Sequence, residues 1–515
     1  MPESFSRRSW YWLGPIVAVG LALRVIGLDH GIPFALGVDE PEIMERSVRM
    51  MKTGELHPHF FDYPGLSMYL HFFVATARFL AGSIAGEWAH LDQAPVSEFY
   101  LWSRAVTAVL GTLTILMVYW AGRRISHATG LVSAALFAVQ SLHVRESHFV
   151  LTDVPMTFFV ALTWVLTLRA HADGRLRSFV WIGIAAGAAA ATKYNGGVAL
   201  LLPILALLLG QGGLGWRLWR LGATALSAGV TFLLCAPYTA LALPEFLNAF
   251  AYLAHMYAKG EPLAEPAWII YLKHLRNNMS IPGMVLAGTG MAIAIGTLIR
   301  RPREQATLAW TLATAFALVY YWMIAGQRLV WGRYLLPLLP FACVLAGGAI
   351  VWIVNTARAR SVKPALATAV GAALLAVAAW QPTTNAVEWL SMIAKTSTAK
   401  QTYDWILANV PPNSKIAFES REVLLPADRY RSEYFALLTR RDTEFYRREG
   451  FDYLVASSSD FRIAFEDVPP NLEALAAYRE LFRLNQLVVT FVPSEDHPGS
   501  ELRIYRVLRD GAEPR

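Results

Sequence analysis

Long apolar runs separated by short polar loops dominate the first three quarters of the chain. Each run approaches the roughly 20 residues that an α-helix needs to cross a lipid bilayer. The pattern predicts eleven membrane-spanning helices, at approximately residues 10–28, 99–121, 129–144, 154–170, 178–192, 197–210, 221–238, 281–299, 307–325, 335–354 and 364–381. The first run is too long for a typical signal peptide, so we expect it to remain as a span.

Arginine and lysine residues recur in alternate connections between these runs. Basic loops favour the cytoplasmic side of a membrane. We therefore expect a multi-pass protein of the inner (plasma) membrane with a cytoplasmic N-terminus. Because the number of spans is odd, the C-terminus is expected outside. The basic connections contain Arg7/Arg8, Arg123/Arg124, Arg175/Arg177, Arg217/Arg220, Arg300/Arg301/Arg303 and Arg358/Arg360/Lys363.

Two long outer loops, 29–98 and 239–280, remain between the expected spans. In the first, Met44, Val48 and Met51 recur at helical spacing opposite charged residues, which predicts an amphipathic helix at the membrane interface. The apolar stretch from Leu66 to Ile84 contains a histidine and an arginine. We expect it to be interfacial or re-entrant, since a twelfth span would reverse every later basic loop.

The composition becomes that of a globular domain after residue 381. Thr398 and Gln401 form a potential capping box for a helix that ends near Asn409. Strands are predicted at 414–419, 452–456, 487–491 and 502–507, with a helix near 472–484. We therefore expect a polytopic α-helical domain over 1–381, which includes the loop 29–98, and an extracytoplasmic α/β domain over 382–515.

The composition supports this division and removes some classes of partner. The chain has 515 residues, of which 55% are hydrophobic and 16% charged, against about a quarter charged in soluble proteins. Its net charge of +7 lies largely in the short loops, so we expect contact with membrane lipids and exclude nucleic acid. Cys235 and Cys343 lie inside apolar runs and predict no disulfide framework.

Two acidic positions could carry chemistry. Asp39 and Glu40 follow the first span; Asp39 could cap the next helix with Glu42, or accept a proton from an attacking hydroxyl. Asp153 lies at the mouth of the fourth span. It could also be a helix cap, but a carboxylate next to a membrane is costly and is often functional.

The candidate cations are Lys193, followed by Tyr194 and Asn195, and Arg333. Each could simply extend its charge to water from the membrane interface. Alternatively, an ammonium and a guanidinium could bind a phosphate group. His255 in the second long loop could add to the same field.

Histidines near these positions raise the question of a metal. His57 and His59 form one candidate pair, and His143, Glu146 and His148 form another group. Neither spacing matches a strong metal-binding signature, so ordinary loop residues are the better interpretation. We predict no metal and no other cofactor, although a divalent ion could assist. The chain also lacks a P-loop or dinucleotide fingerprint.

Several short motifs in fixed order resemble one known class of enzyme. They are Gly37-Val-Asp39-Glu40, Phe61-Asp-Tyr63-Pro64, Thr152-Asp-Val-Pro155, Ala191-Thr-Lys193 and Arg333-Tyr-Leu-Leu-Pro-Leu-Leu-Pro340. Over about residues 10–380 the chain resembles the GT-C glycosyltransferases, and within them the protein O-mannosyltransferase and aminoarabinose transferase superfamily (glycosyltransferase family 39). The resemblance implies a GT-C fold and a sugar donor built on polyprenyl phosphate, used at the outer face.

The resemblance also assigns roles. Asp39 matches the family's catalytic acid, and Asp153 its second acid. Aminoarabinose transferases carry a lysine before the first-loop proline, where this chain has Tyr63. The contact with the donor phosphate is therefore expected mainly from Lys193 and Arg333, with Tyr63 as a third candidate.

The sequence thus predicts an inverting glycosyltransferase. Asp39 would activate an acceptor hydroxyl, while Glu40 and Asp153 orient the acceptor or tune Asp39. The acceptor would be a glycan, a lipid or a protein. The alternatives are a transporter or lipid flippase, and a membrane-anchored binding protein. A transporter predicts acids near the bilayer midplane and repeated halves, neither of which the sequence shows. The residues expected to contact sugar or acceptor are His148, Tyr194, Asn195 and His255.

Overall fold

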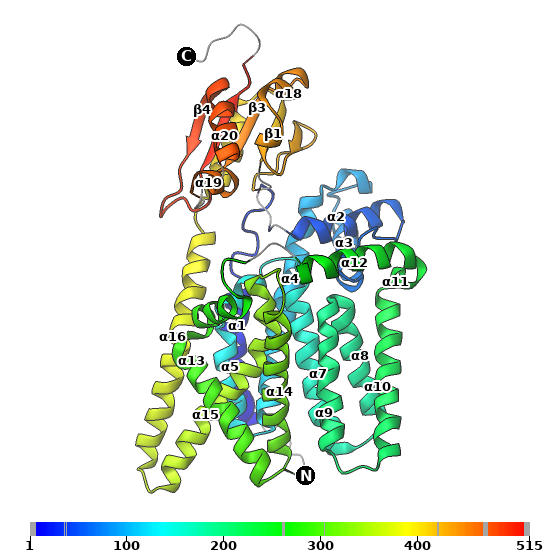
Figure 1. Ribbon diagram of the computed structural model, residues 1–515, viewed down its shortest axis with the longest axis vertical. Helices are drawn as coiled ribbons and strands as arrows, with labels where there is room; N and C mark the ends of the chain where they lie inside the picture. The colour runs from blue at the N-terminus through cyan, green and yellow to red at the C-terminus, as the bar shows by residue number, and fades with distance from the viewer. Residues whose placement is uncertain are drawn as a thin grey trace. The chain divides into compact units, whose positions relative to one another are not determined.

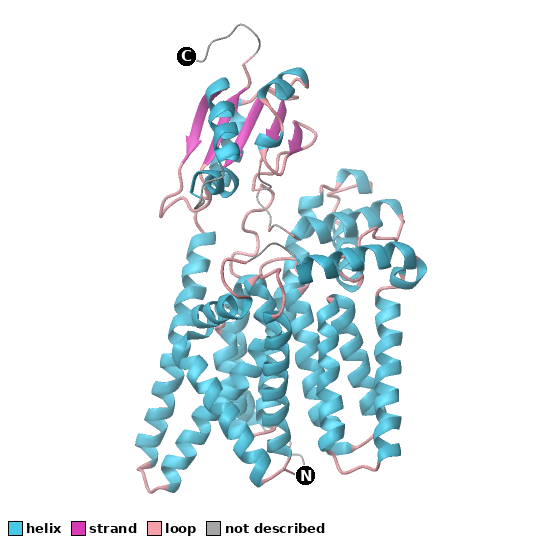
Figure 2. Ribbon diagram, in the orientation of Figure 1, coloured by secondary structure: helices cyan, strands magenta, loops and turns pink. Residues whose placement is uncertain are grey.

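The computed structural model describes residues 7–34, 37, 39–259, 263–302, 304–419, 422–466 and 472–508. These residues are mostly helical, with one sheet near the C-terminus (Figure 2). They form two compact units. The helical unit comprises Met1–Leu28 and Glu42–Trp389, and the sheet unit comprises Asp29–Pro41 and Leu390–Arg515.

The helices of the first unit form a bundle with a smaller group of helices at one end (Figure 1). Two 3₁₀ segments, η3 (Tyr194–Leu200) and η4 (Gly332–Leu338), interrupt the bundle. The helices are α1 (Arg7–Val25), α2 (Glu40–Thr53), α3 (Leu66–Ile84), α4 (Tyr100–Arg123), α5 (His127–Ala138), α6 (Ser141–Glu146), α7 (Asp153–Asp173), α8 (Leu176–Thr192), α9 (Leu201–Leu209), α10 (Leu214–Cys235), α11 (Tyr238–Leu241), α12 (Leu243–Lys259), α13 (Ala267–Arg300), α14 (Gln305–Ala325), α15 (Leu339–Ala359) and α16 (Pro364–Ile393).

The expected polytopic helical fold is confirmed. Seven helical stretches in the described part of the chain are long and apolar enough to cross a membrane, and four shorter apolar helices accompany them. Each of the eleven expected spans overlaps one of these helices, and the exact number of spans stays a prediction. The long stretches are Val96–Arg123, Asp153–Asp173, Leu214–Cys235, Ala267–Arg300, Gln305–Ala325, Gly332–Ala359 and Pro364–Asn409; the shorter ones are Tyr11–Val25, His127–Ala138, Leu176–Thr192 and Tyr194–Leu209.

Lipid provides no hydrophobic driving force for the association of membrane helices, so they associate through close packing. Small residues at the contacts between these helices allow that packing. A Cβ atom at Gly347 on α15 would lie 2.4 Å from the Ser133 hydroxyl on α5. A Cβ atom at Gly290 on α13 would lie 2.3 Å from the carbonyl oxygen of Leu345 on α15. Larger side chains at these two positions would force the helices apart.

The first long loop, residues 29–98, contains the two helices that the sequence predicts. α2 covers the amphipathic stretch, and α3 has the expected bounds of Leu66 and Ile84. The Ser47 hydroxyl donates a hydrogen bond to the carbonyl of Met68 at 2.9 Å and so joins the two helices. Part of the second long loop, residues 239–280, is also helical, since α12 occupies Leu243–Lys259.

The sheet unit carries five strands in the order β2-β1-β3-β5-β4. β1 pairs in parallel with β2 and β3, and β5 pairs antiparallel with β3 and β4. The strands are β1 (Lys415–Phe418), β2 (Arg431–Tyr434), β3 (Tyr453–Ser457), β4 (Gln486–Phe491) and β5 (Leu502–Arg506), and the helices are α17 (Thr398–Asn409), α18 (Thr443–Arg448), α19 (Ser458–Glu466) and α20 (Leu472–Leu484).

All four predicted strands and both predicted helices are present in this unit. Strand β2 was not predicted, because its four residues are all exposed and show no alternation of apolar and polar positions. The expected cap at Thr398 is wrong. The Ser397 side chain accepts the hydrogen bond from the Lys400 amide, while Thr398 is already the first residue of α17 and is buried.

The segment Asp29–Pro41 packs as part of the sheet unit. The Leu424 amide donates a hydrogen bond to the Phe34 carbonyl at 2.7 Å, and the Phe34 ring lies 5.8 Å from the Tyr403 ring. Phe34 also contacts the apolar cluster around Ile406 and Ile416. Phe34, five positions before Asp39, is therefore held by residues more than 350 positions away in the sequence.

Candidate active site

Three ionic residues from separate parts of the helical unit meet at one place. Asp153 is the first residue of α7, and Pro155 follows in the first turn, where a missing backbone donor costs nothing. The Asp153 Oδ1 atom lies 2.7 Å from the Lys193 ammonium, and Oδ2 lies 3.6 Å from the Arg333 Nε atom. We name Asp153, Lys193 and Arg333 the ion cluster.

The local backbone explains how Lys193 reaches this cluster. Helix α8 ends at Thr192 because Lys193 is extended (φ −153°, ψ 134°), and η3 follows at once. A Cβ atom at Gly196 would lie 2.3 Å from the carbonyl oxygen of Ala189. Glycine at this position therefore lets η3 fold back against α8, so that the Lys193 side chain is directed to Asp153 instead of continuing along the helix.

Aromatic rings surround the Lys193 ammonium. It lies 4.3 Å from the centre of the Tyr334 ring and 5.7 Å from that of Tyr63. The Tyr334 hydroxyl lies 2.8 Å from the Tyr257 hydroxyl. Rings at such distances stabilise a cation. The Tyr63 ring thus lies near Lys193, while the predicted contact of Tyr63 with a donor phosphate stays a prediction.

A pocket opens beside the ion cluster. Tyr194 and Asn195 lie in its wall, where the Tyr194 hydroxyl donates to the Phe61 carbonyl at 2.9 Å. Burial raises the pKa of the Asp62 carboxyl group in the same wall. The lining residues are Asp62, Lys193, Tyr194, Asn195, Phe250, Leu253, Ala254, Tyr257, Gln327 and Tyr334.

Two of the predicted contact residues lie elsewhere. His148 is buried, with its Nδ1 atom 2.9 Å from the Val144 carbonyl and its Nε2 atom 2.9 Å from the Ile26 carbonyl. His255 lies on the exposed side of α12 and is not among the residues that line the pocket. The structure therefore gives His148 contacts within the bundle and leaves His255 at the surface.

Asp39 and Glu40 belong to the sheet unit by their packing. Helix α2 begins at Glu40, so Asp39 occupies the position just before a helix that a capping residue takes. Glu40 is fully buried, and its Oε2 atom accepts a hydrogen bond from the Gly37 amide at 2.7 Å. Glu40 thereby closes the turn that carries Asp39.

Four of the pocket residues were not predicted from the sequence: Asp62, Tyr257, Gln327 and Tyr334. Two of them were within reach of the motifs, because Asp62 precedes Tyr63 and Tyr334 follows Arg333. Tyr257 and Gln327 carried no such signal. They come from α12 and from the connection between α14 and η4, and only the fold brings them to Lys193.

The two groups of histidines that were considered as metal ligands differ in the structure. The His143 Nδ1 atom lies 3.2 Å from the buried Arg24 guanidinium, and Glu146 pairs with Arg145 at 2.6 Å. With His148 bound to carbonyls, the predicted candidate group of His143, Glu146 and His148 does not converge on a metal position. In the described ranges, the group that does converge contains His57, His59 and Glu245.

Comparison with known proteins places this architecture in a class. The family described as dolichyl-phosphate-mannose-protein mannosyltransferase matches residues 44–256, which include Asp153 and Lys193. Dolichyl-phosphate-mannose--protein mannosyltransferase 1 of Saccharomyces cerevisiae is 30% identical over 228 residues, which are 40% of this chain and 26% of that protein. The chain thus covers about a quarter of the length of this curated relative.

Two solved structures share the fold over nearly the whole chain. ArnT from Cupriavidus metallidurans bound to undecaprenyl phosphate has a TM-score of 0.61 at 16% identity, covering 98% of this chain and 100% of that one. The Archaeoglobus fulgidus oligosaccharyltransferase in the apo form has a TM-score of 0.58 at 12% identity, covering 99% and 76%.

The protein is therefore a multi-pass membrane protein with the GT-C fold. The resemblance to the GT-C glycosyltransferases of the protein O-mannosyltransferase and aminoarabinose transferase superfamily, predicted from the short motifs, is confirmed.

Proposed function

We propose that the protein transfers a sugar from a polyprenyl-phosphate donor to an acceptor hydroxyl at the outer face of the membrane, with inversion at the anomeric carbon. The observation that carries this proposal is the ion cluster beside the pocket. Two cations, an ammonium and a guanidinium, meet at one carboxylate and bring positive charge to this place. That charge is suited to an incoming phosphate group.

The cluster explains how a phosphate leaving group is stabilised. Negative charge builds on the phosphate as the bond between the anomeric carbon and the phosphate oxygen breaks. Fixed cations aimed at developing charge are most effective when they need no rearrangement. Asp153 supplies this order, because its two oxygens hold Lys193 and Arg333 in place. Its proposed role is thus to position the two cations.

Asp39 is the proposed base. Its carboxylate takes the proton of the acceptor hydroxyl as the hydroxyl oxygen bonds to the anomeric carbon. Polyprenyl phosphate leaves, and Asp39 later releases the proton to solvent. The buried Glu40, through its bond to the Gly37 amide, fixes the turn on which Asp39 lies.

The names of the similar proteins support the class of donor. ArnT is described as bound to undecaprenyl phosphate, and the yeast relative as using dolichyl-phosphate mannose. Both carriers are polyprenyl phosphates. We therefore propose a hexosyl or pentosyl donor on such a carrier, with Tyr63, Tyr194 and Asn195 beside the bound sugar phosphate. The acceptor is a glycan, a lipid or a protein.

Binding of the carrier tests the role of the ion cluster. Arg333→Ala should weaken binding of polyprenyl phosphate to the purified protein by at least about tenfold, since a charge-assisted contact contributes about 1.5–3 kcal/mol. Arg301→Ala, which removes an exposed guanidinium from another loop, is the matched control. Unchanged carrier binding in both Arg333→Ala and Lys193→Met would contradict the proposal.

The transfer reaction separates an enzyme from a transporter. A deletion strain should accumulate the lipid-linked sugar and lose the glycan made from it, both measurable by mass spectrometry. Purified protein should then convert that lipid-linked sugar to free polyprenyl phosphate and glycosylated acceptor. Movement of the intact lipid-linked sugar across vesicles, without its consumption, would instead show a flippase.

A further inference from the structure

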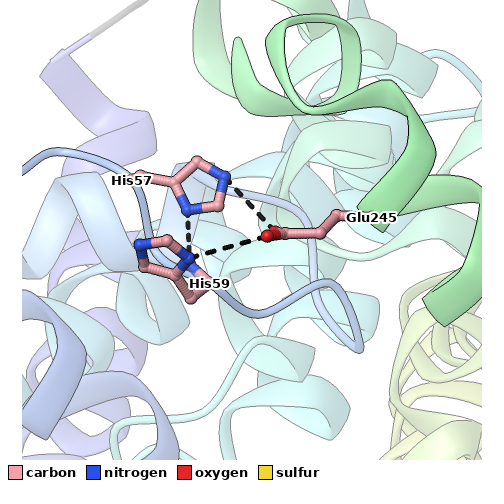
Figure 3. A group of neighbouring side chains, drawn as sticks. All are labelled: His57, His59 and Glu245. Atoms are coloured by element: carbon pink, nitrogen blue, oxygen red, sulfur yellow. Dashed lines mark hydrogen bonds and ion pairs between the residues drawn. The ribbon is translucent and has the colours of Figure 1, made fainter.

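The loop between α2 and α3 brings two histidines to a carboxylate on α12. Figure 3 shows the imidazole rings of His57 and His59 together with the carboxylate of Glu245, from the first turn of α12. The His57 Nε2 atom lies 3.5 Å from one carboxylate oxygen, and the His59 Nδ1 atom lies 3.8 Å from the other. One donor atom from each residue lies within 4.8 Å of the others.

These separations match the size of a small metal ion. Zn²⁺ binds imidazole nitrogen and carboxylate oxygen at about 2.0–2.2 Å in tetrahedral geometry, which places neighbouring ligand atoms about 3.3–3.5 Å apart. The His57–Glu245 distance of 3.5 Å lies at the upper end of this range, and the His59–Glu245 distance of 3.8 Å exceeds it by about 0.3 Å. Small side-chain rotations would therefore complete the site. Imidazole ligands favour Zn²⁺ over Mg²⁺, which prefers oxygen.

A second carboxylate orients one of the rings. The His59 Nε2 atom lies 2.7 Å from Glu55 Oε1, on the side of the ring opposite the Nδ1 atom. Metal-binding histidines usually donate their other ring N–H to such a carboxylate, which fixes the tautomer and makes the free nitrogen a stronger ligand. His59 also has a positive φ of 48°, a conformation that non-glycine residues adopt at a cost.

The His57 imidazole ring contacts Tyr238 and the backbone of His59. The Tyr238 ring packs edge-on against the His57 ring at 4.3 Å. The His59 amide donates to His57 Nδ1 at 3.1 Å. Binding of a metal at Nε2 moves the ring proton to Nδ1, so this backbone hydrogen bond opens when the ion binds.

We propose that His57, His59 and Glu245 bind one Zn²⁺ ion, with Glu55 as the carboxylate behind His59 and a fourth position open to water. The ion ties the loop at 57–59 to the start of α12. Later turns of α12 carry Phe250, Leu253, Ala254 and Tyr257 into the pocket wall. Zinc therefore fixes one wall of the pocket, and the proposal is independent of the reaction that occurs there.

The test uses full-length protein purified with an affinity tag that contains no histidine. As purified, the protein should retain about one Zn²⁺ per chain, measured by elemental mass spectrometry, and a chelator should then remove this ion. The melting temperature of the protein should rise with Zn²⁺ and not with equal Mg²⁺. Hydrogen exchange in α12 should slow at the same time.

Variants of these residues distinguish Zn²⁺ binding at this site from nonspecific Zn²⁺ binding elsewhere on the protein. Glu245→Gln should lower the affinity for Zn²⁺ at least about tenfold, and Glu55→Gln by about 10–100-fold. His90→Asn, which changes an exposed histidine in the connection after α3, should leave the affinity unchanged. A wild-type protein that retains no Zn²⁺, or one that retains as much as a folded His57→Asn/His59→Asn variant, would overturn the proposal.

Discussion

The two units of the molecule each contain a buried carboxylate and stabilise it in different ways. In the helical unit, Asp153 lies between the side chains of Lys193 and Arg333. In the sheet unit, Glu419 is fully buried, and its hydrogen-bond donors are the amides of Leu438 and Ser457 and the Tyr478 hydroxyl.

The two buried carboxyl groups differ in the charge of their partners. Burial raises the pKa of Glu419 to about 7, despite three hydrogen bonds that oppose the shift. Asp153, by contrast, is paired with two cationic side chains. A carboxylate bonded to neutral donors can tie strands together, whereas one paired with two cations can present charge to a ligand. This contrast supports a functional role for the ion cluster and a structural role for Glu419.

Asp39 provides the strongest test, because it packs with the sheet unit and yet has the proposed catalytic role. Asparagine caps a helix about as well as aspartate but cannot accept a proton at neutral pH. Asp39→Asn should therefore leave folding and carrier binding near normal, while turnover falls by about two to four orders of magnitude. The measurement is sugar transfer by purified protein, or the glycan profile of a complemented deletion strain.

Asp39→Glu is the companion variant. It keeps a base but moves the carboxylate by one methylene, so it should retain part of the activity of the wild type. Transfer at the wild-type rate by Asp39→Asn would remove Asp39 from the mechanism and return it to the role of a helix cap.

Lys193→Met tests the buried ion pair through stability. Removing one partner of a buried pair costs about 3–5 kcal/mol, and we expect the lower end of this range because Arg333 remains beside Asp153 at 3.6 Å. We expect a large fall in the melting temperature of the helical unit. Lys273→Met, which breaks an exposed pair with Glu265, should change the free energy of unfolding by less than about 1 kcal/mol. Equal effects of the two variants would contradict the importance of the cluster.

Glu419 should make the stability of the sheet unit depend on pH. The folded protein binds the Glu419 proton more tightly than the unfolded chain, because the pKa rises from 4.5 to about 7 on folding. This contribution to stability is complete below about pH 4.5 and is lost as the pH rises through 7, a fall of about 3 kcal/mol.

Glu419→Gln should remove this slope. Hydrogen exchange in β1 and β3 of the full-length protein, followed from pH 5 to pH 8, measures it. Glu444→Gln changes an exposed carboxylate of the same unit and should keep the wild-type slope. An unchanged slope in Glu419→Gln would show that Glu419 stays ionised throughout.

Phe34→Ala concerns the link between the sheet unit and the segment that precedes Asp39. The half-buried ring contributes about 1–2 kcal/mol to docking of this segment by its apolar area. Its loss should speed hydrogen exchange in residues 29–41 by about 5–30-fold and lower turnover modestly. Phe34→Leu, which keeps most of the apolar contact, should lie close to wild type. Unaltered exchange in Phe34→Ala would mean that the segment is held elsewhere.

The sequence determined the helical architecture because membrane helices are defined locally. Each needs about 20 apolar residues, and lipid requires that its backbone hydrogen bonds close within the segment. The amphipathic period of α2 and the bounds of α3 followed from the same local rules. In the sheet unit the alternation of residues showed four strands, whereas exposed β2 gave no such signal.

The members of the ion cluster were also visible in the sequence, but their partners were not. Asp153, Lys193 and Arg333 are exceptional because charged residues beside apolar runs are costly. Nothing in the spacing of positions 153, 193 and 333 shows that the two cations share one carboxylate. The fold decides this, through the turn at Gly196 and the meeting of α7 with η4.

The histidines also show that spacing along the chain does not identify neighbours in space. Sequence spacing gave His57/His59 and His143/Glu146/His148 equal standing as candidate ligands, because it measures distance along the chain only. In the structure His143 faces Arg24 and His148 bonds to carbonyls, whereas His57 and His59 meet Glu245 from a helix more than 180 residues away. The sequence by itself determined which residues are chemically unusual and which segments are helices or strands. Only the tertiary structure decided which of them are neighbours, because contacts between distant segments depend on the packing of the whole bundle.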